Sequence, residues 1–304
     1  MPTDETAAER LHPIVREAYA RQVVALGAGT DDERLRVAFA SVARERFLGA
    51  PPWQFGRFPL GFVSGSDPIL AYQDVAFVLA AERGVNTGTP SLHARLLHHL
   101  RPEPGQTVLH LGTGTGYYTA ILAHLVGREG RVVAVELDAA LAAAARENLR
   151  DYANVSVVHG DATEWPRMPV DRIDVNFMVS RPADAWIEQL APGGRLLLPI
   201  GFLAPSREKL PGGIVTVRAG SGGAFLIERG DRGFAARWVA PARFIWADGP
   251  LRASEANDAA VRRAFERGGQ AAVNSLIWGD APASPRLWFR GDGWALAFDG
   301  PGDA

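Results

Sequence analysis

The chain has 304 residues, a formal net charge of −2 and 47% hydrophobic residues, which is typical of a globular protein and excludes a disordered or fibrous chain. The balanced charge gives no positive field for nucleic acid or an anionic membrane, and we expect neither as a partner. The absence of cysteine excludes disulfides, thiolate zinc sites and thiol catalysis. The polar start and the lack of a long apolar run predict neither a secretory signal nor a membrane span, so we expect a cytoplasmic protein.

Two helices are predicted between residues 13 and 48, where apolar residues recur every three or four positions. Residues 49–84 are rich in glycine, proline and aromatic residues, and we expect them to form ordered loops. A helix is predicted over 89–100, because Thr89 can cap it, Pro90 suits its first position and its leucines share one face.

Strands and helices then alternate. Strands are predicted at 107–111, 131–137, 154–160, 172–179 and 195–201, and helices at 117–126, 139–149 and 183–190. Short β-branched strands that alternate with helices indicate a parallel sheet covered on both faces. The sequence therefore predicts an α/β fold, with a doubly wound, mostly parallel Rossmann-like sheet, N-terminal helices and a smaller C-terminal extension.

After Gly201 the pattern changes to short strands divided by glycine pairs, which indicates antiparallel pairing. A helix is predicted from Ser254, as its cap, to Ala271, and "RLWFRGDGWALAF" (286–298) is predicted to be a hairpin. We expect residues 1–247 to form the main domain and residues 248–304 to form the extension. Four aromatic residues give the extension enough apolar mass to pack on the main domain: Trp278, Trp288, Phe289 and Trp294.

The segment "HLGTGTGYYTA" (110–120) places Gly112, Gly114 and Gly116 directly after the first predicted strand of the alternating region. A glycine-rich turn at this point lets the backbone approach a ligand closely. The dinucleotide fingerprint is G-x-G-x-x-G, whereas here the third glycine comes one residue early. Acids follow the next two strands, Glu136 and Asp161, and the first of them stands where an acid takes ribose hydroxyls.

This G-x-G-x-G spacing resembles motif I of class I S-adenosylmethionine-dependent methyltransferases. The resemblance implies S-adenosyl-L-methionine as the cofactor, with Glu136 on the ribose and Asp161 near the adenine amine. His110 stands where that class usually has an acid that helps to hold the methionyl amine, and its alternative is a buried, hydrogen-bonded histidine with no ligand contact. The cofactor residues implied are His110, Gly112, Thr113, Gly114, Gly116, Tyr117, Glu136, Leu137, Asp161 and Ala162.

Further strings occur in the order and spacing of the protein L-isoaspartyl O-methyltransferases, which this chain resembles from Leu11 to Trp246. They include "VARERFLG" (42–49), "AYQD" (71–74), "NVSVVHGDA" (154–162) and "LAPGGRLLLPIG" (190–201). The resemblance implies methyl transfer to a carboxylate on a peptide or protein that bears aspartate or isoaspartate. A carboxylate is already ionised at neutral pH, so such a site needs no general base, and no metal spacing appears in the sequence.

The family meets the substrate carboxylate with a Thr-Ile-Ser-x-Pro segment, which corresponds here to Asn86-Thr87-Gly88-Thr89-Pro90. Gly88 thus replaces the family serine, and Thr87, Thr89 or Asn86 are candidates for the lost donor, unless Thr89 only caps the helix. The amides of Ser91 and Leu92 at the helix start also favour an anion.

After the fourth strand the loop is longer and bulkier than in the family. Asn176 and Arg181 lie in it and are candidates to face the substrate, with a surface position as the alternative for Arg181. The extension beyond Trp246 is a third departure. It adds to the core, and we also expect it to form a wall beside the substrate groove.

These departures favour a narrower substrate than general repair. The first hypothesis is esterification of an aspartate side chain in a constrained ribosomal peptide, leading to aspartimide or isoaspartate, as in the branch of the family associated with modified peptides. The alternative is protein-L-isoaspartate O-methylation in repair. A third hypothesis is an inactive module that binds S-adenosylmethionine and a peptide, supported by His110. A nicotinamide oxidoreductase is disfavoured by the early third glycine.

Overall fold

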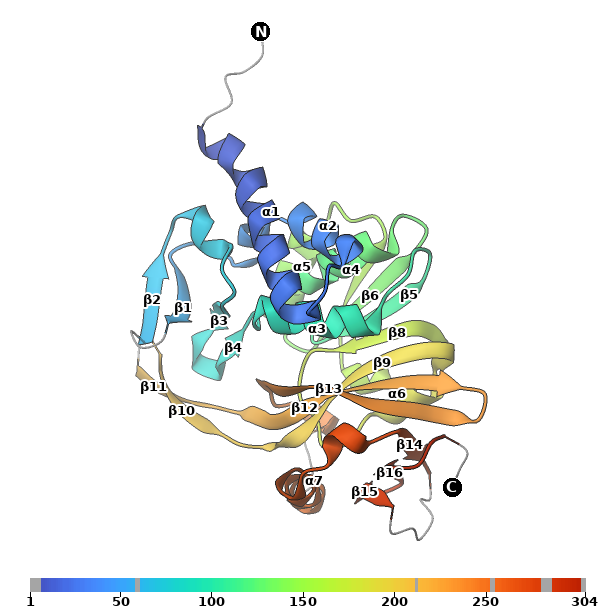
Figure 1. Ribbon diagram of the computed structural model, residues 1–304. Helices are drawn as coiled ribbons and strands as arrows, with labels where there is room; N and C mark the ends of the chain where they lie inside the picture. The colour runs from blue at the N-terminus through green and yellow to red at the C-terminus, as the bar shows by residue number, and fades with distance from the viewer. Residues whose placement is uncertain (1–6, 58–60, 211–212, 252–254, 280–285, 302–304) are drawn as a thin grey trace.

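The computed structural model describes residues 7–57, 61–210, 213–251, 255–279 and 286–301 (Figure 1). The two predicted N-terminal helices are confirmed as α1 (Ala7–Ala28) and α2 (Glu33–Ser41), followed by a 3-10 turn, η1 (Arg44–Phe47). Asp32 caps α2, because its side chain accepts a hydrogen bond from the amide of Leu35.

The expectation that residues 49–84 form only loops is wrong. This region holds an antiparallel hairpin, β1 (Trp53–Arg57) and β2 (Gly61–Gly65), two 3-10 turns, η2 (Pro68–Ala71) and η3 (Ala81–Arg83), and β3 (Val78–Ala80), which pairs with β4 (Val85–Asn86). The strands are short and carry glycines, so their pattern does not show the alternation that identifies a strand. The next helix, α3 (Pro90–Leu100), begins at the predicted residue.

Five parallel strands form one half of a ten-stranded sheet, in the order β9-β8-β5-β6-β7. Their bounds are β5 (Thr107–Leu111), β6 (Arg131–Glu136), β7 (Val155–His159), β8 (Val170–Val175) and β9 (Leu190–Leu203). The connecting helices are α4 (Tyr117–Val126), α5 (Ala139–Asn148) and α6 (Asp184–Glu188), with a 3-10 turn, η4 (Ala162–Glu164), after β7. This alternation confirms the predicted α/β fold with a parallel, doubly wound sheet.

Antiparallel strands complete the sheet beyond β9, in the order β12-β13-β14-β16-β15. Their bounds are β12 (Ala219–Gly230), β13 (Gly233–Ile245), β14 (Ser275–Trp278), β15 (Leu287–Gly291) and β16 (Trp294–Ala297). The remaining elements are η5 (Gly249–Leu251), α7 (Glu255–Arg267), η6 (Gln270–Ala272) and the hairpin of β10 (Ser206–Leu210) and β11 (Gly213–Val217), which extends toward β2. The predicted cap of the last helix, Ser254, lies outside the described residues.

The sheet separates two hydrophobic cores. Val108 belongs to the core beneath α1–α5, whereas its neighbours Leu109 and Leu111 belong to the core beneath α6 and α7, as the alternation of side chains along a strand requires. The predicted hairpin of the extension is confirmed as β15 and β16, and β14 joins it to β13.

The described residues of the C-terminal extension form no core of their own. Trp288, Phe289 and Trp294 are almost fully buried in the same core as Leu109, Trp186 and Phe225, and the indole of Trp288 lies 5.7 Å from the ring of Phe225. The described part of the extension therefore continues the sheet and one of its two cores.

A buried polar cluster lies between β5 and β8. His110, on β5, is fully buried and its Nδ1 lies 2.8 Å from the hydroxyl of Thr119, while its Nε2 lies 3.9 Å from a carboxylate oxygen of Asp174, the residue paired with it on β8. Burial lowers the pKa of His110 to about 3 and raises the pKa of Asp174 to about 7. At neutral pH the imidazole is therefore uncharged.

Replacing Trp294 with alanine tests how firmly the extension belongs to the core. Because Trp294 is fully buried, Trp294→Ala should lower the free energy of unfolding by about 3–5 kcal/mol, measured by chemical denaturation. The control Trp278→Ala removes a partly buried indole that stacks under Arg181, and should cost less. Equal small losses in both variants would mean that the extension packs loosely.

The Asp174 carboxyl predicts a pH dependence of stability. Because its pKa is raised in the folded state, the folded protein holds this proton more tightly than the unfolded chain, so its contribution is full below about pH 4 and is lost as the pH rises toward about 7. In Asp174→Asn the free energy of unfolding should no longer fall over this pH range, where the parent loses at most about 4 kcal/mol through Asp174.

We expect Asp174→Asn to gain stability relative to the parent between pH 4 and 7, with a constant difference above this range, in denaturation curves recorded at each pH. The lowered pKa of His110 makes stability rise with pH in both the parent and the variant. Only the difference in unfolding free energy between the two proteins therefore reports on Asp174. The control Asp231→Asn makes the same charge change at an exposed turn. A difference that does not vary with pH would contradict the assignment.

Candidate functional site

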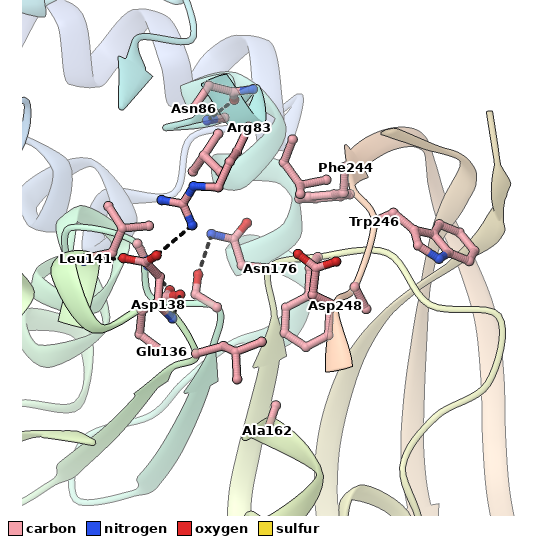
Figure 2. Close-up of a pocket in the computed structure, with 18 of the residues that line it drawn as sticks. Arg83, Asn86, Glu136, Asp138, Leu141, Ala162, Asn176, Phe244, Trp246 and Asp248 are labelled. Atoms are coloured by element: carbon pink, nitrogen blue, oxygen red, sulfur yellow. Dashed lines mark hydrogen bonds and ion pairs between the residues drawn. The ribbon is translucent and has the colours of Figure 1, made fainter. Parts of the chain in front are cut away.

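A cavity of about 500 Å³ opens at the carboxyl ends of the parallel strands, where the chain leaves β5, β6, β7 and β8 (Figure 2). The connections of β5 and β8 run to opposite sides of the sheet at this point, and ligands of open α/β sheets bind at such a switch point. Ten of the predicted site residues lie in its wall: Asn86, Gly88, Thr89, Gly112, Gly114, Glu136, Leu137, Asp161, Ala162 and Asn176.

The glycine-rich turn and the acid after β6 are joined by a direct hydrogen bond. The amide of Gly114 donates to Oε2 of Glu136 over 2.7 Å, and the amide of Asp138 donates to Oε1 over 3.0 Å. Burial raises the pKa of Glu136, while these amide hydrogen bonds oppose the rise. Gly114 has φ +58° and faces open space, since a Cβ added there meets only Leu79, at 3.9 Å. The turn therefore presents bare backbone beside a buried carboxylate.

Leu137, Asp161 and Ala162 line the neighbouring part of the cavity. The Asp161 carboxylate accepts hydrogen bonds from the amide and the hydroxyl of Thr163, at 2.8 and 2.7 Å, and so caps η4. Leu137 is 46% exposed, which is high for a leucine and leaves an apolar face toward the cavity. This part of the cavity therefore has an apolar side, formed by Leu137 and Ala162, between the carboxylates of Glu136 and Asp161.

An ion pair that the sequence analysis missed crosses this part of the cavity. Arg83, from η3, donates to Asp138 over 2.6 Å, and Figure 2 shows the guanidinium lying above Glu136. Asp138 also caps α5 through the amide of Leu141, and this hydrogen bond, together with Arg83, holds the pKa of Asp138 below its usual value. An aspartate before an alanine-rich helix is a detectable cap signal, but nothing in the sequence indicates its partner from η3.

The opposite half of the cavity is formed by the segment before α3 and by the end of β13. Asn86, Gly88, Thr89 and His93 form one side, and residues 243–248 form the other (Figure 2). Asn176 lies between the halves and donates to the carbonyl of Gly112 over 3.2 Å. The part of this wall from residues 243–247 was not predicted, because nothing in the local pattern of β13 reveals that its end folds back over the first strands.

Three predicted catalytic or substrate residues lie outside the cavity wall. The Thr87 hydroxyl is buried and bonds to the amide of Phe77, the guanidinium of Arg44 and the carbonyl of Gly88. The Ser91 amide, expected to attract an anion, already donates to Asp74 over 2.7 Å. Arg181 stacks on Trp278 and bonds to Asp184 and the carbonyl of Asp292.

The capping prediction for α3 needs correction in the same way. Thr89 occupies the N-cap position, but its side chain makes no capping hydrogen bond. Asp74, sixteen residues before Pro90, supplies the carboxylate instead, through Ser91. The cap comes from a distant segment, so local spacing could not reveal it.

Four predicted cofactor residues lie behind the turn instead of in the wall. His110 points into the core, as described above, and Thr113 bonds to the carbonyls of His110 and Val135. Gly116 begins α4 with φ +99°, where a Cβ would lie 2.7 Å from Leu149, and the Tyr117 hydroxyl contacts that of Tyr19 at 3.1 Å. These residues support the turn.

The wall expected from the C-terminal extension is found only at its start, where Asp248 and Leu251 line the cavity. Among the described residues, the cavity wall ends at Leu251, and the elements α7 and β14–β16 contribute nothing to it. The described part of the chain also contains no group of three or more histidine or acidic side chains placed to hold a metal ion. No helix within the described ranges is long and apolar enough to cross a membrane.

Comparisons with known proteins agree with this geometry. A family model described as protein-L-isoaspartate(D-aspartate) O-methyltransferase matches residues 60–209. A protein-L-isoaspartate O-methyltransferase of Aeropyrum pernix is 35% identical over 234 residues, which are 73% of this chain and 84% of that protein. One from Yersinia pestis is 38% identical over 180 residues, which are 57% of this chain and 76% of that protein.

Solved structures show the same fold. A protein-L-isoaspartate O-methyltransferase superposes with a TM-score of 0.60 and 23% identity, covering 94% of this chain and 88% of that chain. A Plasmodium falciparum protein assigned to the same family, in complex with S-adenosyl-L-homocysteine, superposes with a TM-score of 0.55 and 18% identity, covering 78% and 98%. With its glycine-rich turn and acids at the strand ends, this chain belongs to the protein-L-isoaspartate O-methyltransferase family.

Proposed function

We propose that the protein is an S-adenosylmethionine-dependent O-methyltransferase that esterifies the free carboxylate of an isoaspartyl residue in a peptide or protein. The relatives from Aeropyrum and Yersinia are named for this reaction, which supports the isoaspartyl substrate over an ordinary aspartyl one. The observation that carries the proposal is the bare backbone of Gly114 bonded to the buried Glu136 at the mouth of a 500 Å³ cavity.

The residues present fit S-adenosylmethionine. Gly114 leaves room for close approach to the backbone, and the Glu136 carboxylate retains lone pairs that would accept both ribose hydroxyls. Leu137 offers an apolar face for the adenine ring, and Asp161 lies at its polar edge. The cofactor supplies a methyl group on a positively charged sulfur.

The other half of the cavity suits a carboxylate that needs orientation but no proton transfer. The substrate carboxylate is ionised at neutral pH, and the only histidine in the wall formed by described residues, His93, is neutral there, because burial lowers its pKa to about 3. Thr89 and Asn86 face the same space. The task of this half is to hold one carboxylate oxygen in line and to exclude water.

A second candidate substrate is the side chain of an aspartate in a constrained ribosomal peptide. Gly88 favours it, because the position of the family serine carries no hydroxyl to meet the substrate carboxylate. The third hypothesis, an inactive peptide-binding module, loses its support, since His110 lies in the core and not in the cavity wall.

Mass spectrometry with S-adenosylmethionine distinguishes these substrates. The full-length protein is incubated with a peptide that contains isoaspartate, the same peptide with aspartate, and a cyclised peptide with aspartate. We expect a gain of one methyl group on the isoaspartyl peptide alone. Methylation of the cyclised aspartyl peptide alone would replace the first candidate with the second, and binding of the cofactor without any methylation would support the inactive module.

Glu136→Gln tests the cofactor half separately. Loss of the charge on an acceptor of two hydroxyls should weaken S-adenosyl-L-homocysteine binding about 10- to 100-fold in calorimetry. The unfolding midpoint should also fall, because the glutamine NH2 cannot accept the hydrogen bond from the amide of Gly114 or of Asp138. The matched control Glu147→Gln removes an exposed carboxylate from α5 and should leave binding unchanged. Unaltered affinity in Glu136→Gln would remove this residue from the site.

A further inference from the structure

Arg83 reaches into the cofactor half of the cavity from the roof. It belongs to η3, the tight turn that joins β3 to β4, and its guanidinium lies above Glu136 (Figure 2). Asn86, at the end of β4, already lies in the wall of the other half. Arg83 therefore lies where the cofactor half meets the segment that faces the substrate.

The protein uses only part of this guanidinium. Its Nη1 donates to a carboxylate oxygen of Asp138 over 2.6 Å, and its Nε donates to Glu82 over 3.3 Å. Its Nη2 makes no hydrogen bond with any described residue. The side chain of Arg83 is 44% exposed, so a ligand in the cavity can reach this free group. A guanidinium presents its N–H donors as a flat fork and can bind more than one carboxylate at a time.

Acidic side chains dominate the charge of the surrounding wall. The described wall contains four carboxylates, those of Glu136, Asp138, Asp161 and Asp248. Such a wall attracts the sulfonium and the ammonium group of S-adenosylmethionine, but it repels the carboxylate at the methionyl end of the same molecule. Arg83 is the only cationic side chain among the described wall residues outside β13. It is therefore the group that can offset this repulsion.

The other contacts indicate which end of the cofactor meets Arg83. With the ribose hydroxyls on Glu136 and the adenine beside Leu137, the methionyl chain leaves the ribose toward the substrate half, where the methyl group is used. Gly112 and Asn176 line the cavity between the two halves, and the Asn176 side chain donates to the Gly112 carbonyl over 3.2 Å. The guanidinium above Glu136 lies at the start of this path (Figure 2).

We propose that Arg83 binds the methionyl carboxylate of S-adenosylmethionine through its Nη2–H group, while Asp138 keeps the hydrogen bond from Nη1. This proposal rests on the proposed function, because it concerns the cofactor of that reaction. The ion pair with Asp138 holds the guanidinium in place before the ligand arrives, so little side-chain entropy is lost on binding. The methionyl carboxylate takes no part in methyl transfer, so Arg83 acts in binding only.

A ligand without the carboxylate tests this contact from both sides. Calorimetry on the full-length protein compares S-adenosyl-L-homocysteine with its decarboxylated analogue, which keeps the adenosine, the sulfur and the amine. Arg83→Gln should weaken binding of S-adenosyl-L-homocysteine about 5- to 20-fold, because a charge-assisted hydrogen bond is lost. It should not weaken binding of the analogue. The ratio of the two affinities should therefore fall by at least about fivefold.

Two control variants separate the contact from the ion pair and from net charge. Asp138→Asn keeps a residue that caps α5 but removes the charge that pairs with Arg83, and it should keep at least the parent's ratio of affinities. The matched control Arg150→Gln removes an exposed arginine that pairs with Glu147 of α5, and should bind both ligands as the parent does.

An unchanged ratio in Arg83→Gln, or an equal loss of affinity for both ligands, would overturn the proposal. A fall of the ratio in Asp138→Asn as large as in Arg83→Gln would do the same, because the effect would then belong to the ion pair. So would unchanged binding of both ligands with a raised KM for the peptide, which would place the substrate carboxylate on Arg83. Arg83→Met, with the same expected loss, serves where Arg83→Gln does not fold.

The same measurements distinguish this proposal from the proposed function. If the parent binds neither ligand, the proposed function fails and the role of Arg83 fails with it. If the parent binds S-adenosyl-L-homocysteine and Arg83→Gln leaves the ratio unchanged, the role of Arg83 alone is refuted. If the ratio falls as expected while no isoaspartyl peptide is methylated, the role of Arg83 stands and the proposed substrate is wrong.

Discussion

The buried guanidinium of Arg44 organises the irregular chain that forms the roof of the cavity. It is fully buried, and it donates to the carbonyls of Ala71, Gln73 and Val75 and to the hydroxyl of Thr87. The rings of Tyr19, Phe77 and Tyr117 surround it at 5.1–5.9 Å. These acceptors satisfy both terminal nitrogens of the guanidinium, while its Nε has no partner among the described residues. A buried cation needs such acceptors, so the segment 71–87 has little freedom to take another path. The positions of Gly88 and α3 follow from that constraint.

The C-terminal extension acts on the site through the sheet. Without β14–β16, β13 would be an edge strand, and the core that contains Trp186 and Phe225 would lose the cover of Trp288 and Trp294. The end of β13 and residues 246–251 form one side of the cavity, and Asp161 approaches this wall, since a Cβ at Gly249 would lie 3.1 Å from its carboxylate. The extension therefore stabilises the strand whose end lines the cavity and adds Asp248 and Leu251 to the wall, while α7 and β14–β16 stay outside it.

Much of the fold could be predicted, because the parallel strands and α3–α5 have clear periodicity and the glycines mark the turn. Glu136 could be predicted from its place at the end of a strand and its spacing from the glycines, and Asp161 from the resemblance to methyltransferases, which have an acid at the end of that strand. The remainder depends on pairs that are distant in sequence. Asp74 caps α3, Arg83 meets Asp138, and Phe244 closes the cavity opposite His93, and no local pattern encodes these partners. His110 does not line the cavity because its side chain points into the core. Ser91 does not line it either, and its amide already donates to the carboxylate of Asp74.

The charges around the cavity fit a reaction in which charge disappears. Arg83 is neutralised by Asp138, and Arg243, in the wall near Phe244, is exposed and makes no ion pair with any described residue. An exposed arginine attracts a carboxylate at long range but is screened by solvent, so it stabilises the bound anion only weakly. A cation deep in the site would stabilise the ionised substrate more than the transition state, in which the carboxylate is losing its charge, and would slow the reaction.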